Sequence, residues 1–510
     1  MMHGREKSGP AIVAMKLANG PAQAAMEPVE QRAGAKGNAG QHSTHRAQNR
    51  ESVSQGLDRI RQAARQRKEE KFTALLHHLD SEALREAYYA LKRDAAPGID
   101  GLRWQDYEAG LEGNLEDLHD RVHRGGPYHP LPARRHYIAK PDGRQRPLAI
   151  AALEDKIVQR AMQSILNATY EEDFLGISYG FRPGRGQHDA LDALSVGIIT
   201  RKVNWIVDAD ISSFFDSVNQ QWLIRFLEHR IGDTRVIRLI QKWLKAGVLE
   251  NGVVSVSDKG TAQGAVISPL LANVYLHYVI DLWAEQWRRR EAQGDMIIVR
   301  YADDIVAGFE HEADARRYLD AMRERLEAFS LSLHPDKTRI IRFGRFAAKQ
   351  RKERGLGKPD TFNFLGFTFI CGQNRRGGFL LKRKTRSDRM RAKLKEIKEA
   401  LRRRMHEPIP DVGKWLKQVV GGYFNYHAVP TNGNALGAFR RQVGRLWCRA
   451  LRRRGNKHGT SWAHHAQLVK EYLPAARIRH PWPEQRFAVK YPRWEPYARK
   501  THVRFCAGGA

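Results

Sequence analysis

The sequence predicts an α+β fold over residues 54–382 and a helical region after it. Short apolar runs typical of strands, at 205–210, 296–301 and 305–309, lie among longer stretches with helical periodicity. Strands and helices do not alternate in a regular βαβ rhythm, which argues against a doubly wound parallel sheet. After about residue 380 the strand pattern ends, and basic segments with helical periodicity follow.

The charge balance indicates a polyanionic partner. The 510 residues include 87 Lys and Arg against 56 Asp and Glu, which leaves a net charge of +31 and a pI near 10.2. Such a protein gains binding free energy by releasing counterions from nucleic acid phosphates. The three cysteines, Cys371, Cys448 and Cys506, lie far apart without a C-x-x-C pair. This spacing excludes a disulfide scaffold and an all-cysteine zinc site, and it is typical of a reducing compartment.

No segment is expected to cross a membrane. The longest uncharged stretch, 260–280, contains Gln263, Ser268, Pro269 and Asn273, which a hydrocarbon span of about 20 residues would not tolerate. The N-terminus lacks the apolar run of a secretory signal. We therefore expect a cytoplasmic protein without a membrane partner.

The chain is expected to begin with a disordered extension. Residues 1–53 are basic and contain no Trp, Tyr or Phe, so nothing there can anchor a core. Helical periodicity begins at Ser54 and ends at Ala96-Pro97-Gly98, because a Pro-Gly pair stops a helix.

A hairpin and further helices are expected next. Strand-like runs at 136–140 and 146–150 flank Pro141-Asp142-Gly143, which is typical of a hairpin turn. Helical texture follows at 153–170, 221–246 and 269–290.

Two groups of carboxylates carry the predicted chemistry. Tyr301-Ala302-Asp303-Asp304 stands between two strand candidates, so the acidic pair is expected at a tight turn. Adjacent carboxylates repel each other unless a divalent cation bridges them, and Mg²⁺ prefers carboxylate oxygens together with substrate phosphates. The alternative interpretation is an ordinary acidic hairpin turn.

The second group, Asp208 and Asp210, ends the apolar strand at 205–210, and alternation places both on one face. A carboxylate there can face the acidic turn across an antiparallel sheet. Three carboxylates can then hold two metal ions that clamp the attacking and leaving oxygens of an in-line phosphoryl displacement. Asp210 is preferred as the third metal-binding carboxylate because it lies closer to the turn. Asp208 is the other candidate, and its expected role is structural.

The segments that begin at Asp210 (Asp-Ile-Ser-Ser-Phe-Phe) and Tyr301 (Tyr-Ala-Asp-Asp) resemble two palm motifs of reverse transcriptases, and the chain is similar in particular to the reverse transcriptase/maturase of bacterial group II introns. Six further blocks stand in the order of that family, at 96–101, 138–148, 179–185, 260–273, 334–338 and 362–367. The resemblance implies a right-hand polymerase, with fingers and an antiparallel palm sheet over 54–382 and a helical thumb/maturase region over 383–460.

The resemblance also implies residue roles. Asp210, Asp303 and Asp304 would hold two Mg²⁺ ions, while a primer 3′-hydroxyl attacks the α-phosphate of a deoxynucleotide. Lys140 and Arg146, on the two arms of the hairpin, would meet the triphosphate.

Three further positions complete the implied substrate site. Phe215 is similar to the steric gate that excludes a ribose 2′-hydroxyl, with Phe214 as the alternative because one of the two rings should point into the core. Gln263 would pack beside the templating base pair, and Ala262 departs from the proline usual in the family. Lys337 is expected either near the leaving pyrophosphate or in a structural role at a helix end.

The region after the palm is expected to bind RNA. Residues 382–404 hold twelve basic and three acidic residues in helical texture, too few acids for the i,i+4 pairs of a merely solvated helix. The segment 415–427 resembles the maturase region of the family, which implies binding of the intron RNA. Residues 461–510 are expected to form a basic nucleic-acid-binding tail without an endonuclease domain, because Cys506 is alone and His464-His465 has no metal spacing.

The predicted function is therefore an RNA-directed DNA polymerase of a group II intron that assists the splicing and mobility of its intron. Its partners would be intron RNA, an RNA template, a DNA primer and deoxynucleotides; no oligomeric state is predicted. Two alternatives stay open: a non-enzymatic splicing cofactor on a polymerase fold, and a reverse transcriptase recruited to phage defence or diversification. The complete set of three aspartates argues against the first alternative, and the blocks at 260–273 and 415–427 argue against the second.

Overall fold

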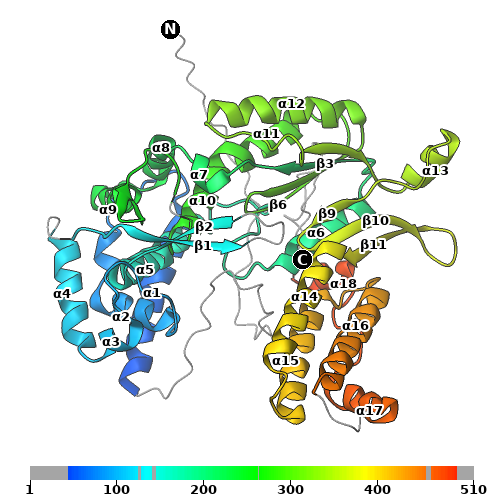
Figure 1. The fold of residues 1–510 in the computed structure, drawn as a ribbon. Helices are drawn as coiled ribbons and strands as arrows, with labels where there is room; N and C mark the ends of the chain where they lie inside the picture. Colours follow the sequence, from blue (N-terminus) through cyan, green and yellow to red (C-terminus); the bar gives the residue numbers. More distant parts are fainter. Residues whose placement is uncertain (1–43, 125–127, 140–144, 262, 455–460, 491–510) are drawn as a thin grey trace, which may run out of the picture.

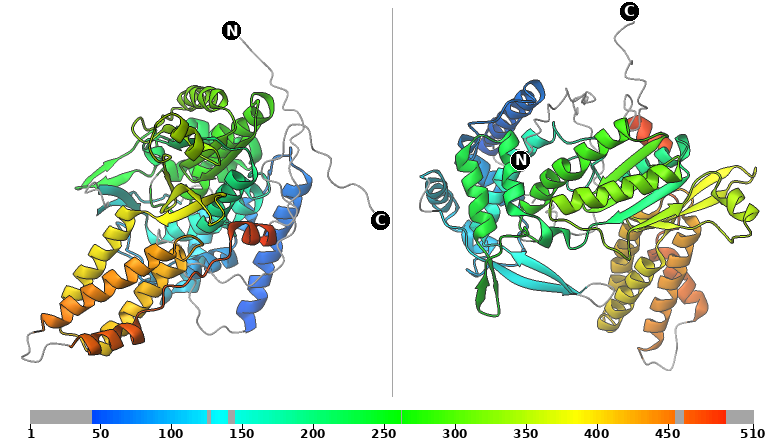
Figure 2. Two further views of the ribbon diagram at one scale, coloured as in Figure 1. Left: turned by 90° about the vertical axis from the view of Figure 1, so that its right-hand side faces the viewer. Right: turned by 90° about the horizontal axis from the view of Figure 1, so that it is seen from above.

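The computed structural model describes residues 44–124, 128–139, 145–261, 263–454 and 461–490 (Figure 1). Three sheets are surrounded by helices within these residues. The N-terminal helices lie on one side of a central sheet, and the C-terminal helices project from the other side (Figures 1 and 2). No helix in the described ranges combines the length and the apolar character needed to cross a membrane.

The N-terminal layer consists of helices that pack around α5. Its elements are α1 (Thr44–Gln66), the 3₁₀ helix η1 (Leu76–His78), α2 (Ser81–Ala90), α3 (Trp104–Glu108), α4 (Leu111–His123) and α5 (Leu153–Tyr170). The last of these matches the helix predicted over 153–170. Buried side chains from all of these helices join one apolar cluster, which continues into the central sheet.

Helix α1 begins ten residues before the predicted start at Ser54. Residues 44–53 are therefore helical, whereas the rest of the predicted extension lies outside the described residues. No Gly or Pro interrupts residues 44–55, and a helix extends at little cost from a turn that packing already holds. Ile60 and Ala64 supply that packing, since both are buried.

The predicted hairpin is confirmed and is part of a four-stranded sheet. Strands β1 (Ala133–Ala139) and β2 (Gln145–Ile150) pair antiparallel, with Arg146 opposite Ile138. Two short strands that the sequence pattern did not reveal, β4 (Val248–Glu250) and β5 (Val253–Ser255), extend the sheet in the order β2-β1-β4-β5. The turn at 140–144, and with it Lys140, lies outside the described residues.

The central sheet contains the three predicted strands. It has the order β6-β7-β3-β8, with β3 (Trp205–Asp210), β6 (Met296–Tyr301), β7 (Asp304–Phe309) and β8 (Arg339–Arg342). All of its pairings are antiparallel, as predicted for the palm. An antiparallel sheet can bring residues that are far apart in the sequence to the same edge.

Helices cover both faces of this palm sheet. One face packs on α6 (Gln187–Thr200) through Ile206, Ile297 and Val306, and the other packs on the remaining palm helices through alternate residues such as Val207 and Ile298. Those helices are α7 (Phe214–Ser217), α8 (Gln220–Arg230), α9 (Thr234–Lys245), α10 (Ser268–Leu276), the π-helix η2 (His277–Asp281), α11 (Leu282–Arg290) and α12 (Glu312–Ala328). The predicted helix at 221–246 is therefore two helices, separated at residues 231–233.

A small three-stranded sheet follows the short helix α13 (Ala347–Glu353). It consists of β9 (Phe362–Phe364), β10 (Phe367–Gln373) and β11 (Phe379–Thr385) in the order β11-β10-β9. The predicted domain boundary at 382/383 falls inside β11. Its basic residues hid the strand pattern, in which Leu381, Arg383 and Thr385 point inward and are buried. Arg383 can be buried because its guanidinium donates to Asp192 at 2.8 Å.

The C-terminal region is helical, as predicted. It contains α14 (Ser387–Arg403), α15 (Ile409–His427), α16 (Gly433–Arg452), α17 (Trp462–Tyr472) and α18 (Pro483–Lys490). Leu468 and Leu473 join the same apolar cluster as Leu416 and Phe439. Helix α17 is therefore part of this core, although residue 461 was the predicted start of a separate tail.

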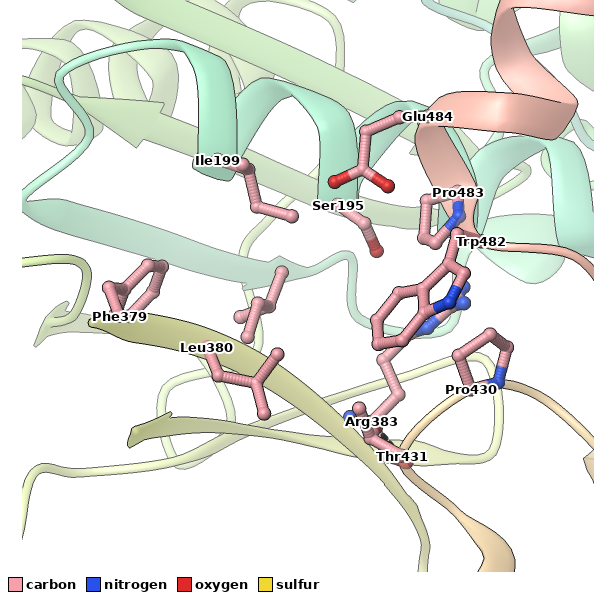
Figure 3. A pocket seen from close by; sticks show the side chains of 11 residues that line it. Ser195, Ile199, Phe379, Leu380, Arg383, Pro430, Thr431, Trp482, Pro483 and Glu484 are labelled. Carbon is pink, nitrogen blue, oxygen red and sulfur yellow. Dashed lines mark hydrogen bonds between the residues drawn. The ribbon is translucent and has the colours of Figure 1, made fainter. Parts of the chain in front are cut away.

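Helix α18 returns to the palm and packs on α6. Arg486 and Arg383 both donate to the buried carboxylate of Asp192, and Phe487 joins the cluster beneath α6. A cavity of about 120 Å³ lies at this junction, where Trp482 and Pro483 face β11 (Figure 3). None of its lining residues belongs to the predicted catalytic set.

Candidate active site

The palm sheet brings the predicted carboxylates together at one edge. Asp210, the last residue of β3, lies directly opposite Asp304, the first residue of β7. Tyr301 pairs with Asp304 across the β6–β7 hairpin, which leaves Ala302 and Asp303 as a two-residue turn. The sheet register therefore joins two motifs that are about 90 residues apart in the sequence.

The two aspartates at the end of β3 share a face but differ in environment. Asp208 lies opposite Val306 and faces Arg339 at 3.5 Å. Burial raises the pKa of Asp208 to about 6, and the neighbouring Asp210 adds to this effect, whereas Arg339 opposes it. Asp210 lies at the end of the strand, beside the turn. This position next to the turn is the reason why the sequence favoured Asp210 over Asp208 as a metal ligand.

Asp210 is held by the block at 334–338. The Lys337 Nζ lies 2.5 Å from the Asp210 Oδ2, and the backbone N–H of His334 donates to the Asp210 carbonyl at 2.7 Å. About half of the Lys337 side chain is exposed, so the ion pair contributes at most about 1 kcal/mol. Lys337 can therefore exchange Asp210 for another anion. Neither of the roles considered for Lys337 from the sequence included a contact with Asp210.

The two candidates for the steric gate, Phe214 and Phe215, differ in their burial. Phe214 is 3% exposed and belongs to the apolar core, whereas Phe215 is half-buried at its margin. Their rings meet edge to face at 5.4 Å between centroids. The Phe215 carbonyl accepts the Thr261 N–H at 2.8 Å, which holds the block at 260–273 against this corner of the palm.

Gln263 links the same block to the hairpin that carries Arg146. The Ala149 N–H donates to the Gln263 carbonyl at 2.6 Å, and Gly264 follows with a φ of +114°. A Cβ on Gly264 would lie 2.7 Å from the Ala149 carbonyl oxygen, so a side chain there would displace the strand. The candidate residues Phe215, Gln263 and Arg146 thus lie on segments that are hydrogen-bonded to one another, whereas Lys140 and Ala262 lie outside the described residues.

Sequence reasoning did not single out Arg300, although this residue is completely buried next to the acidic turn. A signal was present: Arg300 is a lone charge in the apolar run Met296-Ile-Ile-Val-Arg-Tyr301. A charge inside a buried strand needs a partner, and the partner cannot be identified from the strand itself.

Comparison with known proteins places this geometry in a family. A model of the reverse transcriptase (RNA-dependent DNA polymerase) domain matches residues 138–369, which include the acidic turn and both strands that meet it. The Escherichia coli K12 protein YkfC is 35% identical over 316 residues, an alignment that covers 55% of this chain and 77% of YkfC.

Two more relatives have names that refer to introns. The group II intron-encoded protein LtrA of Lactococcus lactis is 35% identical over 223 residues, which cover 43% of this chain and 37% of LtrA. Nuclear intron maturase 3 of Arabidopsis thaliana is 28% identical over 130 residues, or 25% of this chain and 18% of that protein. The matches thus span most of YkfC but less than half of the two intron proteins. Because Asp210 lies opposite Asp304 at the edge of the palm sheet and the chain is similar to these proteins, we conclude that it belongs to the group II intron reverse transcriptase/maturase family.

Proposed function

We propose that this protein is an RNA-directed DNA polymerase that binds a group II intron RNA and assists its splicing and mobility. The observation that carries the proposal is the register of the palm sheet, which sets Asp210 opposite Asp304 with Asp303 in the adjoining turn. Three carboxylates at an open sheet edge suit a reaction that needs cations beside a phosphate.

The donor chemistry of this edge fits Mg²⁺. The described residues hold no preassembled group of three or more His, Cys, Asp or Glu side chains in a metal-binding arrangement. Mg²⁺ does not need such a cage, because it commonly takes one or two carboxylates, waters and the substrate phosphates. Asp210, Asp303 and Asp304 would hold two Mg²⁺ ions, which would neutralise the charge that develops on the transferred phosphate.

The neighbouring residues would place the other reactants. Arg146 and Lys140 would bind the triphosphate of the incoming deoxynucleotide, and Lys337 would leave Asp210 to meet the departing pyrophosphate. Phe215 would contact the sugar, and Gln263 would pack beside the templating pair. The hydrogen bonds that link the segments of Phe215, Gln263 and Arg146 support a single substrate pocket.

The C-terminal helices support the RNA-binding part of the proposal. Arg391, Lys395, Lys398 and Arg402 are exposed on α14 at spacings of three and four residues, so they form one stripe. Arg441, Arg445 and Arg449 form a second exposed stripe on α16, which packs on α14. Exposed cations on two neighbouring helices suit the phosphate backbones of a structured RNA.

The test is primer extension with deoxynucleotides on an RNA template, at several Mg²⁺ concentrations. Asp303→Ala should abolish extension, because it removes one of the three carboxylates. Asp320→Ala, on the exposed surface of α12, is the matched control and should extend like the parent protein.

Splicing of the intron RNA is then measured with the same variants. Splicing assistance that persists in Asp303→Ala would separate RNA binding from polymerisation. If the unmodified protein bound the RNA tightly and promoted splicing but extended no primer, the polymerase proposal would fail and the splicing-cofactor alternative would replace it.

A further inference from the structure

Arg300 is a fully buried cation whose hydrogen bonds are all satisfied. It is 0% exposed and lies one residue before Tyr301, near the end of β6. Its Nε donates to the Asp281 Oδ1 at 2.7 Å, and its Nη2 donates to the Asp281 Oδ2 at 2.6 Å. Asp281 is also 0% exposed, so the two form a bidentate ion pair without contact to solvent.

The remaining three donors of Arg300 hold uncharged groups. Nη1 donates to the Ala302 carbonyl at 3.1 Å and to the Asn273 side-chain carbonyl at 3.0 Å. Nη2 also donates to the Ser178 hydroxyl at 2.7 Å. The contact with Ala302 is the informative one, because this carbonyl belongs to the turn and immediately precedes Asp303.

The same region is fixed from the outer side of β6. The Arg300 N–H donates to the Ile177 carbonyl, and the Tyr179 N–H donates to the Arg300 carbonyl. Gly180 then passes so close to the turn that a Cβ there would lie 2.4 Å from the Ala302 nitrogen. The Asn273 side-chain amide donates to the Gly180 carbonyl at 2.7 Å, which joins this segment to the Arg300 hydrogen bonds.

Two of the sequence blocks therefore converge on the acidic turn. The block at 179–185 contributes Gly180, and the block at 260–273 contributes Asn273 at its end. Ala302 has a φ of +56°, an unfavourable value for a residue with a side chain. Such a conformation persists only where its surroundings hold it. Arg300, Asn273 and Gly180 provide those surroundings.

We propose that Arg300 is a positioning residue for the candidate active site: through the Ala302 carbonyl it fixes the turn that presents Asp303 and Asp304. Asp281 neutralises the guanidinium, so the cation does not compete with metal ions for the carboxylates. Because Arg300 is 0% exposed and its donors are all used within the protein, it would touch neither substrate nor metal. The inference rests on the proposed metal-dependent transfer.

Lysine cannot replace this arrangement. Its three N–H donors diverge from one atom, whereas the acceptors around Arg300 surround a planar group with five donors. Arg300→Lys should lower kcat for primer extension by about a hundredfold, the effect of a small misplacement of catalytic groups. The KM for the deoxynucleotide should change little, because the side chain does not contact it.

A second measurement needs no catalysis. Mn²⁺ binding to the full chain, followed by electron paramagnetic resonance without substrate, should weaken about tenfold in Arg300→Lys. Unchanged Mn²⁺ affinity and kcat in the folded variant would overturn the proposal. If the unmodified protein extended no primer, the polymerase proposal would fail, whereas the Mn²⁺ titration would still test the role of Arg300.

Arg230 supplies the matched control. It is 2% exposed and pairs with Asp173 at 2.9 Å, and its other donors meet the carbonyls of Ala64, Arg67 and Glu70. None of these groups belongs to the acidic turn. Arg230→Lys and Arg300→Lys should both lower the midpoint of thermal unfolding, because each disturbs a buried ion pair. Arg230→Lys should nevertheless leave kcat and Mn²⁺ affinity unchanged.

A double variant separates positioning from stability. Replacing both charges, in Arg300→Met with Asp281→Leu, should recover much of the thermal stability lost in Arg300→Lys, because an apolar pair can substitute for a buried ion pair. It should not recover kcat, because nothing then holds the Ala302 carbonyl. Recovery of both quantities together would mean that Arg300 only stabilises the fold, and the proposal would be wrong.

Discussion

The palm and the C-terminal helices differ in where their cationic side chains lie and in whether they form ion pairs. In the palm, Arg300 and Arg182 are almost completely buried, and each meets a carboxylate, Asp281 or Glu171, in a bidentate pair. On α14, Lys395 and Lys398 point into solvent, and no ion pair to either is present among the described residues. The first arrangement orients neighbouring groups, and the second leaves charge available to a partner.

The difference follows from what each region is proposed to do. A buried ion pair costs desolvation, so it is useful where hydrogen-bond geometry must be maintained. An exposed cation keeps its hydration and mobility, and it can meet phosphates whose positions vary along an RNA. The proposed chemistry of the palm therefore depends on the positions of a few groups. The proposed RNA binding by α14 and α16 depends instead on how many cations they expose.

The sharpest test within the palm compares the two aspartates of β3. Asp210→Asn should reduce primer extension by at least about a thousandfold, since it removes a charge from the proposed metal site. Asp208→Asn should cost less than about tenfold, because Asp208 lies two residues farther from the acidic turn and faces Arg339. Single-turnover extension at saturating Mg²⁺ measures both. Equal losses would show that Asp208 also takes part in the chemistry.

The neighbouring phenylalanines should also differ. Phe214→Ala should lower the free energy of unfolding by about 3–5 kcal/mol, because Phe214 is buried in the core. Phe215→Val should cost less stability, since Phe215 is only half-buried, but it should increase the incorporation of ribonucleotides. Denaturant titration measures the loss of stability, and primer extension with ribonucleotides measures the change in sugar selectivity. Loss of sugar selectivity in Phe214→Ala alone would reverse the assignment.

For the C-terminal helices the effect should scale with the number of charges. Neutralising Lys395, Lys398 and Arg402 should reduce the slope of log affinity against log salt by about 2, at roughly 0.7 for each lost phosphate contact. Filter binding of intron RNA between about 50 and 200 mM salt measures this slope.

The control for this experiment lies on α12. Arg316 and Arg323 are also exposed, but each already pairs with an acidic residue, Glu312 or Asp320. Neutralising both should leave the slope unchanged. A reduced slope in this control would mean that RNA covers the palm helices as well.

The smallest expected effect concerns Asp155, a buried carboxyl with no arginine partner among the residues that the structure describes. Asp155 accepts hydrogen bonds from the Tyr128 hydroxyl at 2.6 Å and from the Leu131 N–H at 3.0 Å. Burial nevertheless raises the pKa of Asp155 to about 6. Because the folded state favours the protonated form, this contribution to stability is complete below about pH 4 and is lost as the pH rises through 6.

Asp155→Asn should therefore flatten the pH dependence of unfolding between about pH 4 and 6. Urea titrations at several pH values measure this change. An unchanged pH profile would mean that Asp155 is charged throughout, and that the N-terminal layer tolerates a buried charge without an arginine partner of the kind that Asp281 has in the palm.

Much of the fold could be predicted from local sequence patterns. The strands at 205–210 and 296–301 are apolar runs of the right length, and the hairpin around residues 141–143 carries typical turn residues. The motif that begins at Tyr301 was placed at a turn by the strands on either side of it, and the structure has that turn. These features depend on neighbours in the sequence, so they can be recognised there.

Other features depended on partners that are distant in sequence. Strand β11 looked like part of a basic helix because its buried Arg383 meets Asp192, nearly 200 residues away. Helix α17 looked like part of a tail because its apolar residues find their cluster only when α15 and α16 are in place. In both cases the local pattern was ambiguous, and packing decided the outcome.

The sequence by itself determined which residues could carry the chemistry: three aspartates at strand ends, a basic hairpin and a cationic C-terminal region. Only the tertiary structure decided that Asp210 lies opposite Asp304, that Lys337 meets Asp210, and that Arg300 holds the turn. The physical reason is that strand register and buried ion pairs are selected by the free energy of the whole assembled core. No short segment contains that information.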